Sequence, residues 1–167
     1  MSTIVKIIMG DITKLQVDAI VNGANSTLLG GGAIDAAIHK AAGPKLMEDL
    51  KSLGGCKTGE AKITDGHDLL AKKIIHTVPP VWIDGNSLEE EDLINCYKNS
   101  LELAIRNKLK TVAFPAIGTG AFRFPVERAF QVALESIRKF TGYSEAIDEI
   151  FLVAFDQETF EIFKKNF

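Results

Sequence analysis

Short runs of hydrophobic residues alternate along this chain with longer segments that have a helical period. The β-branched and apolar runs predict strands at 3–9, 19–21, 60–64, 73–78, 111–116 and 150–155. Segments with apolar residues on one face predict helices at 33–42, 45–53, 88–108, 126–140 and 158–167. Because buried strands that alternate with helices form parallel sheets covered on both faces, this order predicts an α/β fold with a mainly parallel sheet.

The residues at the predicted helix ends support these boundaries. Gly43 and Pro44 follow the helix at 33–42 and cannot easily continue it. Ser87 is the predicted N-cap of the helix at 88–108, and Glu90, three residues later, is its predicted capping-box partner. Pro125 suits the start of the helix at 126–140, because a proline in the first turn loses no helical hydrogen bond.

Composition narrows the classes of protein that need to be considered. The 167 residues suit one domain, which we expect to span 1–167. The net charge is −3 at pH 7, whereas nucleic-acid-binding domains are usually basic, so we expect no nucleic-acid partner. No apolar stretch reaches the roughly 20 residues of a membrane span. Cys56 and Cys96 form no CxxC pair, so we expect reduced thiols in a cytoplasmic protein. No Cys or His spacing suits zinc, so we expect no metal. We also expect a monomer.

The informative motifs follow three of the predicted strands. They are GDIT (10–13), NGANSTLLGGG (22–32) and the GTGAF segment (118–122). In open α/β sheets, ligands bind beyond the carboxyl ends of the strands, so these loops are the candidate site. Each motif alone also suits an ordinary turn, since glycine, asparagine and aspartate are common turn residues.

Two of these loops contain glycines and lead toward a helix. Backbone N–H groups of such loops can approach a phosphate closely, and a helix N-terminus adds positive potential. Two of them could therefore hold the two halves of a diphosphate. The first loop lacks the third glycine of a dinucleotide-binding fingerprint, since Asp35 stands there, and no Gly-Lys-Ser/Thr of an NTPase loop follows.

Six motifs in a fixed order carry a resemblance to a known family. They are GDIT, DAIVNGANSTLLGGGAIDAAIHKAAG, TGEAKIT, IIHTVPPVW, FPAIGTGAFRFP and VAFD. Together they resemble the macrodomain family, close to its branch of O-acetyl-ADP-ribose deacetylases and mono-ADP-ribosyl hydrolases. The resemblance implies a three-layer α/β/α sandwich around a mixed, mostly parallel sheet. It also implies that ADP-ribose, free or attached to a protein, binds at the strand ends without any cofactor.

The resemblance assigns the two ends of the ligand to particular residues. Asp11 would accept a hydrogen bond from the adenine amine, and the Ile12 backbone N–H would reach a ring nitrogen. Phe155 would pack against the adenine, although an ordinary core position is the alternative. The first phosphate loop would be Gly31, Gly32, Ala33 and Ile34. The second would be Gly118, Thr119, Gly120, Ala121 and Phe122, with Phe122 covering the distal ribose.

The same resemblance implies a catalytic pair, Asp35 and Asn25. Asn25 would hydrogen-bond a hydroxyl of the distal ribose, and Asp35 would orient or partly deprotonate a water that attacks an ester. The simpler alternative for Asp35 is a first-turn aspartate favoured by the helix dipole. His39 lies four residues further on the same helix face and would brace the loop or the distal ribose.

Some positions depart from the family pattern and leave two functions open. Ala33 and Ala36 stand where glycine is usual, and Arg123 replaces a glycine of the second loop. One expectation is an enzyme that hydrolyses ester-linked ADP-ribose on Asp or Glu side chains, or O-acetyl-ADP-ribose. The alternative is a non-catalytic reader of ADP-ribose marks, because Ala33 or an inward-pointing Arg123 would obstruct the reactive pose.

Overall fold

The computed structural model describes residues 2–167, which form six strands and five α-helices. The strands are β1 (Ile4–Met9), β2 (Ala19–Gly23), β3 (Ala61–Asp65), β4 (Lys73–Thr77), β5 (Thr111–Phe114) and β6 (Glu149–Ala154). The helices are α1 (Ala33–Ala42), α2 (Lys45–Leu53), α3 (Glu89–Arg106), α4 (Val126–Thr141) and α5 (Gln157–Asn166), with a short 3₁₀ helix, η1 (Ile12–Lys14). Each strand and helix predicted from the hydrophobic pattern is present, with small shifts at the ends.

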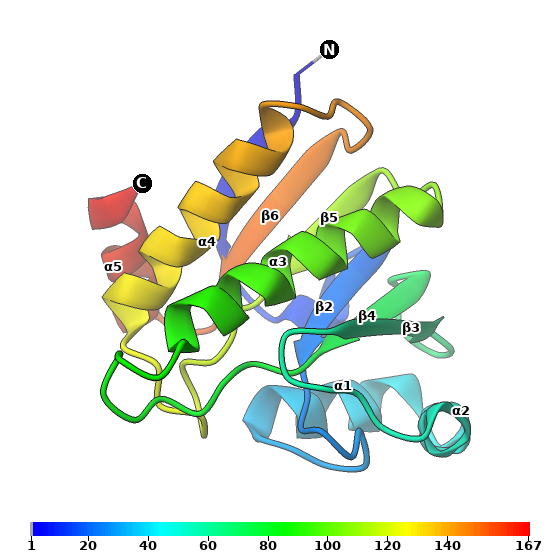
Figure 1. Cartoon of the computed structure of the whole chain (residues 1–167). Helices are drawn as coiled ribbons and strands as arrows, with labels where there is room; N and C mark the ends of the chain where they lie inside the picture. The colour runs from blue at the N-terminus through cyan, green and yellow to red at the C-terminus, as the bar shows by residue number, and fades with distance from the viewer. Residues whose placement is uncertain (1) are drawn as a thin grey trace.

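The strands form one sheet in the order β1-β6-β5-β2-β4-β3 (Figure 1). All neighbouring strands run parallel except β3 and β4, which form an antiparallel pair at one edge. The prediction of a mixed, mostly parallel sheet is therefore confirmed. Since β1, β2, β5 and β6 are parallel, the segments that follow them all emerge at the same edge of the sheet.

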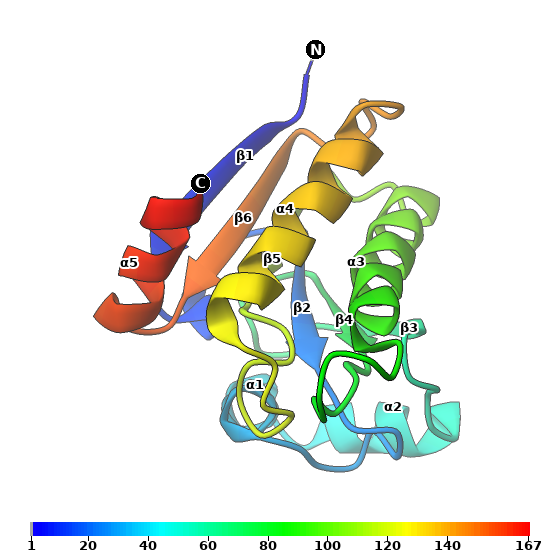
Figure 2. The same cartoon turned by 60° about the vertical axis from the view of Figure 1, so that its left-hand side comes forward.

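Helices cover both faces of the sheet and make two hydrophobic cores. The larger core lies under α3, α4 and α5 and includes Val21, Leu101 and Phe130. The other lies under α1 and α2 and includes Ile20 and Leu46. Figure 2 shows α3 and α4 along one face of the sheet, with α1 and α2 away from them. The α/β/α sandwich is confirmed, and the alternation of Ile20 and Val21 between the cores reflects the two-residue period of a strand.

The start of α3 differs from the prediction. Leu88, in the left-handed conformation with φ of 67°, occupies the N-cap position, and it makes no side-chain capping bond. The prediction that Ser87 caps this helix with Glu90 is therefore wrong. Glu90 instead accepts two hydrogen bonds from Arg128 on α4, and Glu89 takes over the local N–H groups. A capping pattern identifies local pairs only, whereas here a partner from a distant helix is available to Glu90.

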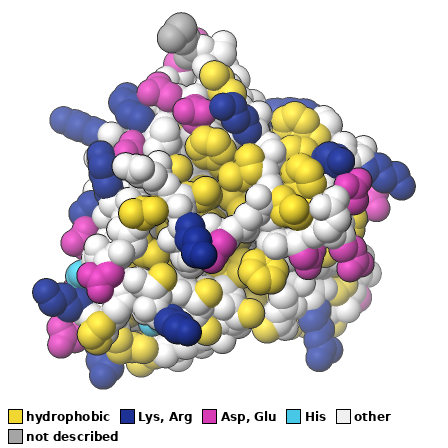
Figure 3. All heavy atoms as spheres, turned by 180° about the vertical axis from the view of Figure 1, so that it is seen from behind, with side chains coloured by type: hydrophobic (Ala, Val, Ile, Leu, Met, Phe, Trp, Pro, Cys, Tyr) yellow, Lys and Arg dark blue, Asp and Glu magenta, His cyan; other side chains and the backbone are white. Residues whose placement is uncertain are grey.

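The structure also adds detail to the segments that follow β5 and β1. β5 ends at Phe114 rather than residue 116, because Pro115 has no N–H to continue the ladder. GDIT alone also suited an ordinary turn; it leads into η1, where Asp11 caps the helix by accepting from the Thr13 backbone N–H at 2.9 Å. The face of the molecule opposite the viewer of Figure 1 carries exposed hydrophobic side chains between charged ones (Figure 3).

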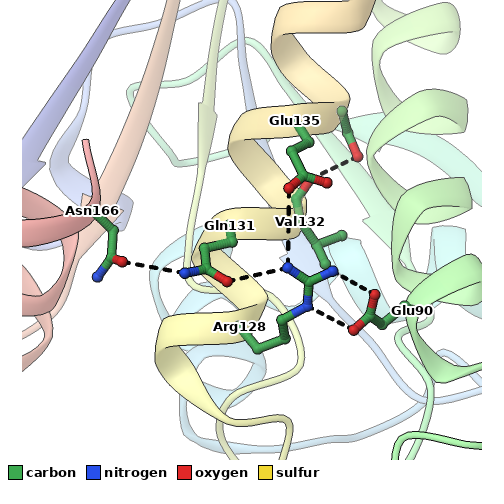
Figure 4. A network of polar contacts seen from close by, with 7 residues as sticks. Glu90, Arg128, Gln131, Val132, Glu135 and Asn166 are labelled. Atoms are coloured by element: carbon green, nitrogen blue, oxygen red, sulfur yellow. Dashed lines mark hydrogen bonds and ion pairs between the residues drawn. The ribbon is translucent and has the colours of Figure 1, made fainter.

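A polar network joins the three helices on one side of the sheet (Figure 4). Arg128 of α4 donates to both carboxylate oxygens of Glu90 on α3, each at 2.6 Å, and also to Gln131. Gln131 donates in turn to Asn166 of α5 at 3.3 Å. The hydrogen bond from Arg128 lowers the pKa of Glu90 below its ordinary value. The two-pronged geometry gives this surface pair a fixed orientation that most exposed ion pairs lack.

We expect Arg128→Ala to lower the free energy of unfolding by about 0.5 to 1 kcal/mol, because solvent screens a pair in which both side chains are more than a third exposed. Urea denaturation at low and at high salt measures the loss, which shrinks as salt rises. Glu135→Ala is the matched control, since Glu135 approaches Arg128 only at 4.0 Å. Equal losses for the two variants would contradict the importance of the Glu90 pair.

Candidate ligand site at the strand ends

A cavity of about 410 Å³ opens at the edge of the sheet where the parallel strands end. Its walls come from the segments after β1, β2, β5 and β6 and from the first turns of α1. The lining residues are Gly10, Asp11, Ile12, Thr13, Gly23, Gly32, Ala33, Ile34, Asp35, Ala37, Pro79, Pro115, Ala116, Ile117, Gly118, Thr119, Gly120, Ala121, Phe122, Val126, Val153, Phe155, Asp156 and Thr159. Its volume suits a drug-sized or nucleotide-sized ligand, for which pockets of about 300–1,000 Å³ are typical.

Two acidic residues and an aromatic ring share part of the cavity wall. Asp11 accepts from the backbone N–H and the hydroxyl of Thr13 through Oδ1, and the hydroxyl bond lowers the pKa of Asp11. Asp156 caps α5 by accepting from the Thr159 N–H, which lowers the pKa of Asp156. Phe155 lines the cavity and is 74% exposed, so it is not an ordinary core residue. An exposed aromatic face in a pocket is suited to stacking against a planar ligand.

The first glycine loop leads directly into α1. Gly32 is the N-cap of α1 and supplies no side-chain bond to the helix end. The N–H groups in the first turn of a helix have no intrahelical acceptor, and Ala33 and Ile34 of that turn line the cavity. Gly31 lies close behind Asp35, because a Cβ on Gly31 would stand 3.1 Å from the Asp35 Cβ and 3.3 Å from Oδ2. This loop therefore needs a small residue at 31 and leaves N–H donors at the cavity wall.

The second glycine loop faces the first across the cavity. Gly118 has a φ of 83°, and a Cβ there would meet Pro79 at 3.4 Å. Within residues 2–167, the backbone N–H groups of Gly120, Ala121 and Phe122 have no protein acceptor. The two loops approach each other so closely that a Cβ on Gly32 would lie 3.8 Å from the Ala121 Cβ. Backbone donors from both loops thus converge on the same space, as an anion site requires.

Asp35 is the buried carboxylate of this site. Its residue is 3% exposed, and Asn22 donates to its Oδ1 at 2.6 Å. His39, one turn further along α1, places Nε2 3.4 Å from the same oxygen. Among residues 2–167, no side chain or backbone group donates a hydrogen bond to Oδ2. The carboxylate is therefore anchored through one oxygen, and the other has no donor among the described residues.

The structure brings most of the predicted site residues to the cavity but not all of them. Those that line it are Asp11, Ile12, Gly32, Ala33, Ile34, Asp35, Gly118, Thr119, Gly120, Ala121, Phe122 and Phe155. Gly31, Asn25 and His39 are not part of the lining. Gly31 and His39 both contact Asp35 instead, whereas Asn25 is half-buried and accepts from the Thr27 hydroxyl at 2.8 Å.

The positions that depart from the expected glycine pattern are also placed. Ala33 lines the cavity, whereas Ala36 is exposed and lies outside the lining. Arg123 is exposed, has a φ of 67° and does not line the cavity. The outward orientation left open for Arg123 is therefore the one that the structure adopts. Its left-handed backbone is the conformation that a glycine would adopt without strain.

Sequence reasoning missed Glu89, which organises a loop beside the site. Glu89 is 2% exposed, and its Oε2 accepts from the backbone N–H groups of Ile83 at 3.0 Å, Asp84 at 3.1 Å and Gly85 at 2.8 Å. Its Oε1 accepts from the Ser87 N–H at 2.5 Å. Three consecutive acidic residues at a helix start are favoured by the helix dipole in any protein, so the sequence held no signal for this role.

The loop held by Glu89 is attached to the second glycine loop. The Trp82 backbone N–H donates to the Phe122 carbonyl at 2.7 Å, and the Trp82 ring packs on Phe124 at a centroid distance of 4.6 Å. Gly85 passes so close to this ring that a Cβ would stand 2.7 Å from it. Glu89 therefore supports the position of Phe122 from outside the cavity.

The chemistry available at the site is that of carboxylates and backbone donors. Among residues 2–167, no three His, Cys, Asp or Glu side chains gather closely enough to hold a metal ion. Burial raises the pKa of the Cys56 thiol and raises that of Cys96 to about 12, so neither is a ready nucleophile.

Within residues 2–167, no helix is long and apolar enough to cross a membrane.

Fold and site together define a three-layer α/β/α protein with a ligand cleft between two glycine loops. The sequence profile of the family described as Macro domain matches residues 21–133, more than half of the chain. The chain therefore belongs to the macro domain family, as its motifs predicted.

Named relatives and solved structures of this family cover nearly the whole chain. The "ADP-ribose glycohydrolase MACROD2" of Homo sapiens is 48% identical over 166 residues, which span 97% of this chain and 39% of that protein. The "O-acetyl-ADP-ribose deacetylase" of Klebsiella pneumoniae is 44% identical over 164 residues, with 96% and 94% covered. The Oceanobacillus iheyensis macrodomain, solved with ADP, is 40% identical, with a TM-score of 0.92 over 96% of this chain and 87% of that one.

Further structures of the Oceanobacillus macrodomain carry single replacements. One replaces a glycine and contains ADP-ribose, one replaces an aspartate and one replaces an asparagine. In chain order the asparagine, the glycine and the aspartate are separated by seven and by three positions.

We expect the stability of this protein to fall on acidification because of Glu89. Burial alone raises the pKa of Glu89, but the N–H groups of Ile83, Gly85, Ser87 and Asp84 outweigh it and lower the pKa from 4.5 to about 2. A carboxyl with a lowered folded-state pKa stabilises the fold fully above pH 4.5, and this contribution is lost as the pH falls toward 2. Thermal unfolding of the wild type from pH 7 downward measures the loss.

Glu89→Gln should lower the unfolding temperature already at pH 7 and should weaken its dependence on pH below 4.5, because the glutamine cannot accept as a charged group. Glu91→Gln is the control, since Glu91 belongs to the same first turn of α3 and takes no part in the Glu89 hydrogen bonds. If both variants keep the wild-type pH profile, another carboxylate causes the acid instability.

Proposed function

We propose that this protein is an ADP-ribose-binding hydrolase that cleaves ester-linked ADP-ribose. The substrates would be mono-ADP-ribose on Asp or Glu side chains of proteins, O-acetyl-ADP-ribose, or both. The observation that carries the proposal is the anchored carboxylate of Asp35, which lies at the wall of a cavity between two loops of unpaired N–H donors. The proposal includes one macro domain over residues 1–167 that acts as a cytoplasmic monomer; the free thiols Cys56 and Cys96 suit a reducing compartment.

The proposed ligand matches the chemistry of the cavity from end to end. The diphosphate would accept from the first turn of α1 and from Gly120, Ala121 and Phe122, where no acceptor among residues 2–167 competes. The adenine would lie against the exposed ring of Phe155, with the free oxygen of Asp11 available to its amine. The distal ribose would then reach Asp35 and Phe122. No cofactor is needed, because the ligand carries the bond to be broken.

In the proposed reaction, Asp35 orients a water molecule or takes up its proton. The water oxygen adds to the ester carbonyl, the bond to the ribose oxygen breaks, and the ribose hydroxyl and a carboxylic acid are released. General-base help of this kind contributes about a hundredfold to ten-thousandfold in rate. Asn25 would hold a hydroxyl of the distal ribose once a ligand competes with Thr27 for its amide, and His39 would brace Asp35 from its position at 3.4 Å.

Relatives support this assignment of activity. MACROD2 is named an ADP-ribose glycohydrolase and the Klebsiella protein an O-acetyl-ADP-ribose deacetylase, and both align with nearly all of this chain. Asn25, Gly32 and Asp35 are separated by the same intervals of seven and three as the asparagine, glycine and aspartate replaced in the Oceanobacillus macrodomain.

The test is release of free ADP-ribose from a protein mono-ADP-ribosylated on glutamate or aspartate, with O-acetyl-ADP-ribose assayed in parallel. We expect Asp35→Ala to lower turnover by about a hundredfold or more, the contribution of a general base. ADP-ribose affinity, measured by calorimetry, should change little, because the diphosphate and adenine contacts remain. Unchanged turnover in Asp35→Ala would refute the role of Asp35.

A reader of ADP-ribose marks is the second candidate, and the place of Ala33 in the cavity lining is the observation that favours it. Binding of ADP-ribose without product from either substrate over a long incubation would establish this function. Ala33→Gly then distinguishes steric obstruction from a missing catalytic group, since turnover should appear only in the first case.

Phe155→Ala should weaken ADP-ribose binding about tenfold, because an aromatic pair contributes roughly 0.5–1.5 kcal/mol beyond its buried area. The fold should tolerate the change, since this ring is 74% exposed. Calorimetry measures the affinity and thermal unfolding provides the control. An unchanged affinity would mean that the adenine does not lie against this ring.

A further inference from the structure

A chain of buried polar side chains runs from the edge of the sheet to the candidate catalytic carboxylate. Thr64 on β3 is hydrogen-bonded to His76 on β4, with Oγ1 2.9 Å from Nε2. On the other side of the ring, Nδ1 of His76 lies 3.3 Å from Nδ2 of Asn22 on β2, and this Nδ2 donates to Asp35 at 2.6 Å. The four residues are 7%, 0%, 0% and 3% exposed, so the chain is closed to solvent.

The sheet itself brings these residues into line. Asn22 and His76 are register partners on the adjacent parallel strands β2 and β4. Thr64 lies diagonally across from His76 on the antiparallel strand β3, on the same face of the sheet. Helix α1 packs on that face and places Asp35 within hydrogen-bond distance of Asn22. Thus each residue is fixed by the backbone of a different element.

The direction of each hydrogen bond follows from the protonation of His76. Burial, reinforced by the nearby His39, lowers the pKa of His76 to about 3, so its ring is neutral at physiological pH. The Asn22 amide group has two N–H bonds, of which one points to Asp35 and the other to Nδ1 of His76. Nδ1 must then be the acceptor. Nε2 therefore carries the ring proton and donates a hydrogen bond to Oγ1 of Thr64.

This chain prevents the Asn22 amide from rotating. In the opposite orientation its carbonyl oxygen would face a carboxylate oxygen on one side and a ring nitrogen lone pair on the other. The amide carbonyl of Asn22, in contrast, is buried and has no hydrogen-bond partner among residues 2–167. The asparagine thus leaves one buried group unpaired in order to supply N–H donors to Asp35 and His76.

We propose that Asn22 is a positioning residue for Asp35, and that Thr64 and His76 hold its amide in the orientation that anchors Oδ1 of the carboxylate. Oδ2, which accepts no hydrogen bond from residues 2–167, is thereby left for the water of the proposed reaction. The inference rests on the hydrolytic role proposed above for Asp35, and it assigns functions to three residues that do not line the cavity.

Asn22→Asp tests the donor while it preserves volume. It replaces the N–H with an oxygen, so two carboxyls face each other at the 2.6 Å position and share a proton. The neighbouring titratable groups are His39 on α1, His76 on β4 and Lys62 on β3, whose ammonium is bound to the Leu53 and Gly55 carbonyls. We expect kcat to fall by about ten- to a hundredfold, the cost of misplacing a catalytic group by an ångström.

Two further measurements on Asn22→Asp distinguish a positioning role from a general loss of structure. The KM and the Kd for ADP-ribose should stay within about threefold of the wild type, because the lost interaction acts in the reaction step. The acidic limb of the kcat/KM profile should move to higher pH. A fall in binding equal to the fall in kcat, with an unmoved pH profile, would indicate a structural role only and would overturn the proposal.

Thr64 provides an independent pair of variants further from the carboxylate. Thr64→Val removes the acceptor for Nε2–H with little change of volume, so the ring can change tautomer and release Asn22. We expect a several-fold fall in kcat, and Thr64→Ser should recover most of it because the hydroxyl is retained. Ser100→Ala is the control. Ser100 is buried like Thr64, but its hydroxyl has no partner among the described residues and it lies on α3 across the sheet. Equal kinetics for Thr64→Val and Thr64→Ser would overturn the proposal that Thr64 acts on Asn22 through His76.

The tautomer of His76 can be measured without any turnover. Long-range ¹H–¹⁵N NMR spectra of the wild type, assigned with His76→Gln, show which ring nitrogen carries the proton. We expect Nε2–H with an unprotonated Nδ1 throughout the physiological pH range. A proton on Nδ1 would overturn the inference even in an active enzyme. If the wild type releases no ADP-ribose, the hydrolytic function fails separately, and the NMR result still decides the arrangement around Asn22.

Discussion

The hydrogen bond between Asn22 and Asp35 links the centre of the sheet to the helix that opens the first glycine loop. Asn22 belongs to β2, a central strand with parallel neighbours on both sides, and it is the register partner of His76 on β4. Asp35 lies in the first turn of α1, and a bond of 2.6 Å between the two fixes the carboxylate against the end of β2. Gly31 then passes close behind that carboxylate, because only a residue without a Cβ fits there without displacing it. The shape of the cavity wall therefore depends on this contact.

The second wall is built in a different way. The loop after β5 begins at Pro115 and is folded by its own backbone bonds, such as that from the Phe124 N–H to the Gly118 carbonyl at 2.8 Å. Its position depends on Trp82, which donates to the Phe122 carbonyl and packs on Phe124. Trp82 is supported in turn by the loop that Glu89 gathers with four backbone bonds. One wall is thus held by the core of the sheet, and the other by a buried carboxylate at the start of α3.

The contrast explains how far sequence reasoning could reach. Strand and helix order follows from local hydrophobic periods, and the glycine loops are contiguous motifs, so both were predictable. Asn22 and Glu89 were not identified as site residues, because their roles depend on partners from other strands or on the fold of a neighbouring loop. His76 lies in a strand that the sequence predicted, but its link to Asp35 needs the register of β2, β3 and β4. Phe155 was ambiguous until its exposure was known.

The charge of the site has a further physical consequence. Among residues 2–167, no lysine or arginine lines the cavity, whereas Asp11, Asp35 and Asp156 do. A diphosphate in this cavity would be held by backbone dipoles and a helix N-terminus, which act over short distances and in fixed directions. Longer phosphate chains would gain no additional cation from this lining. An acidic protein can in this way accept one compact anionic ligand without the many basic contacts on which nucleic-acid binding depends.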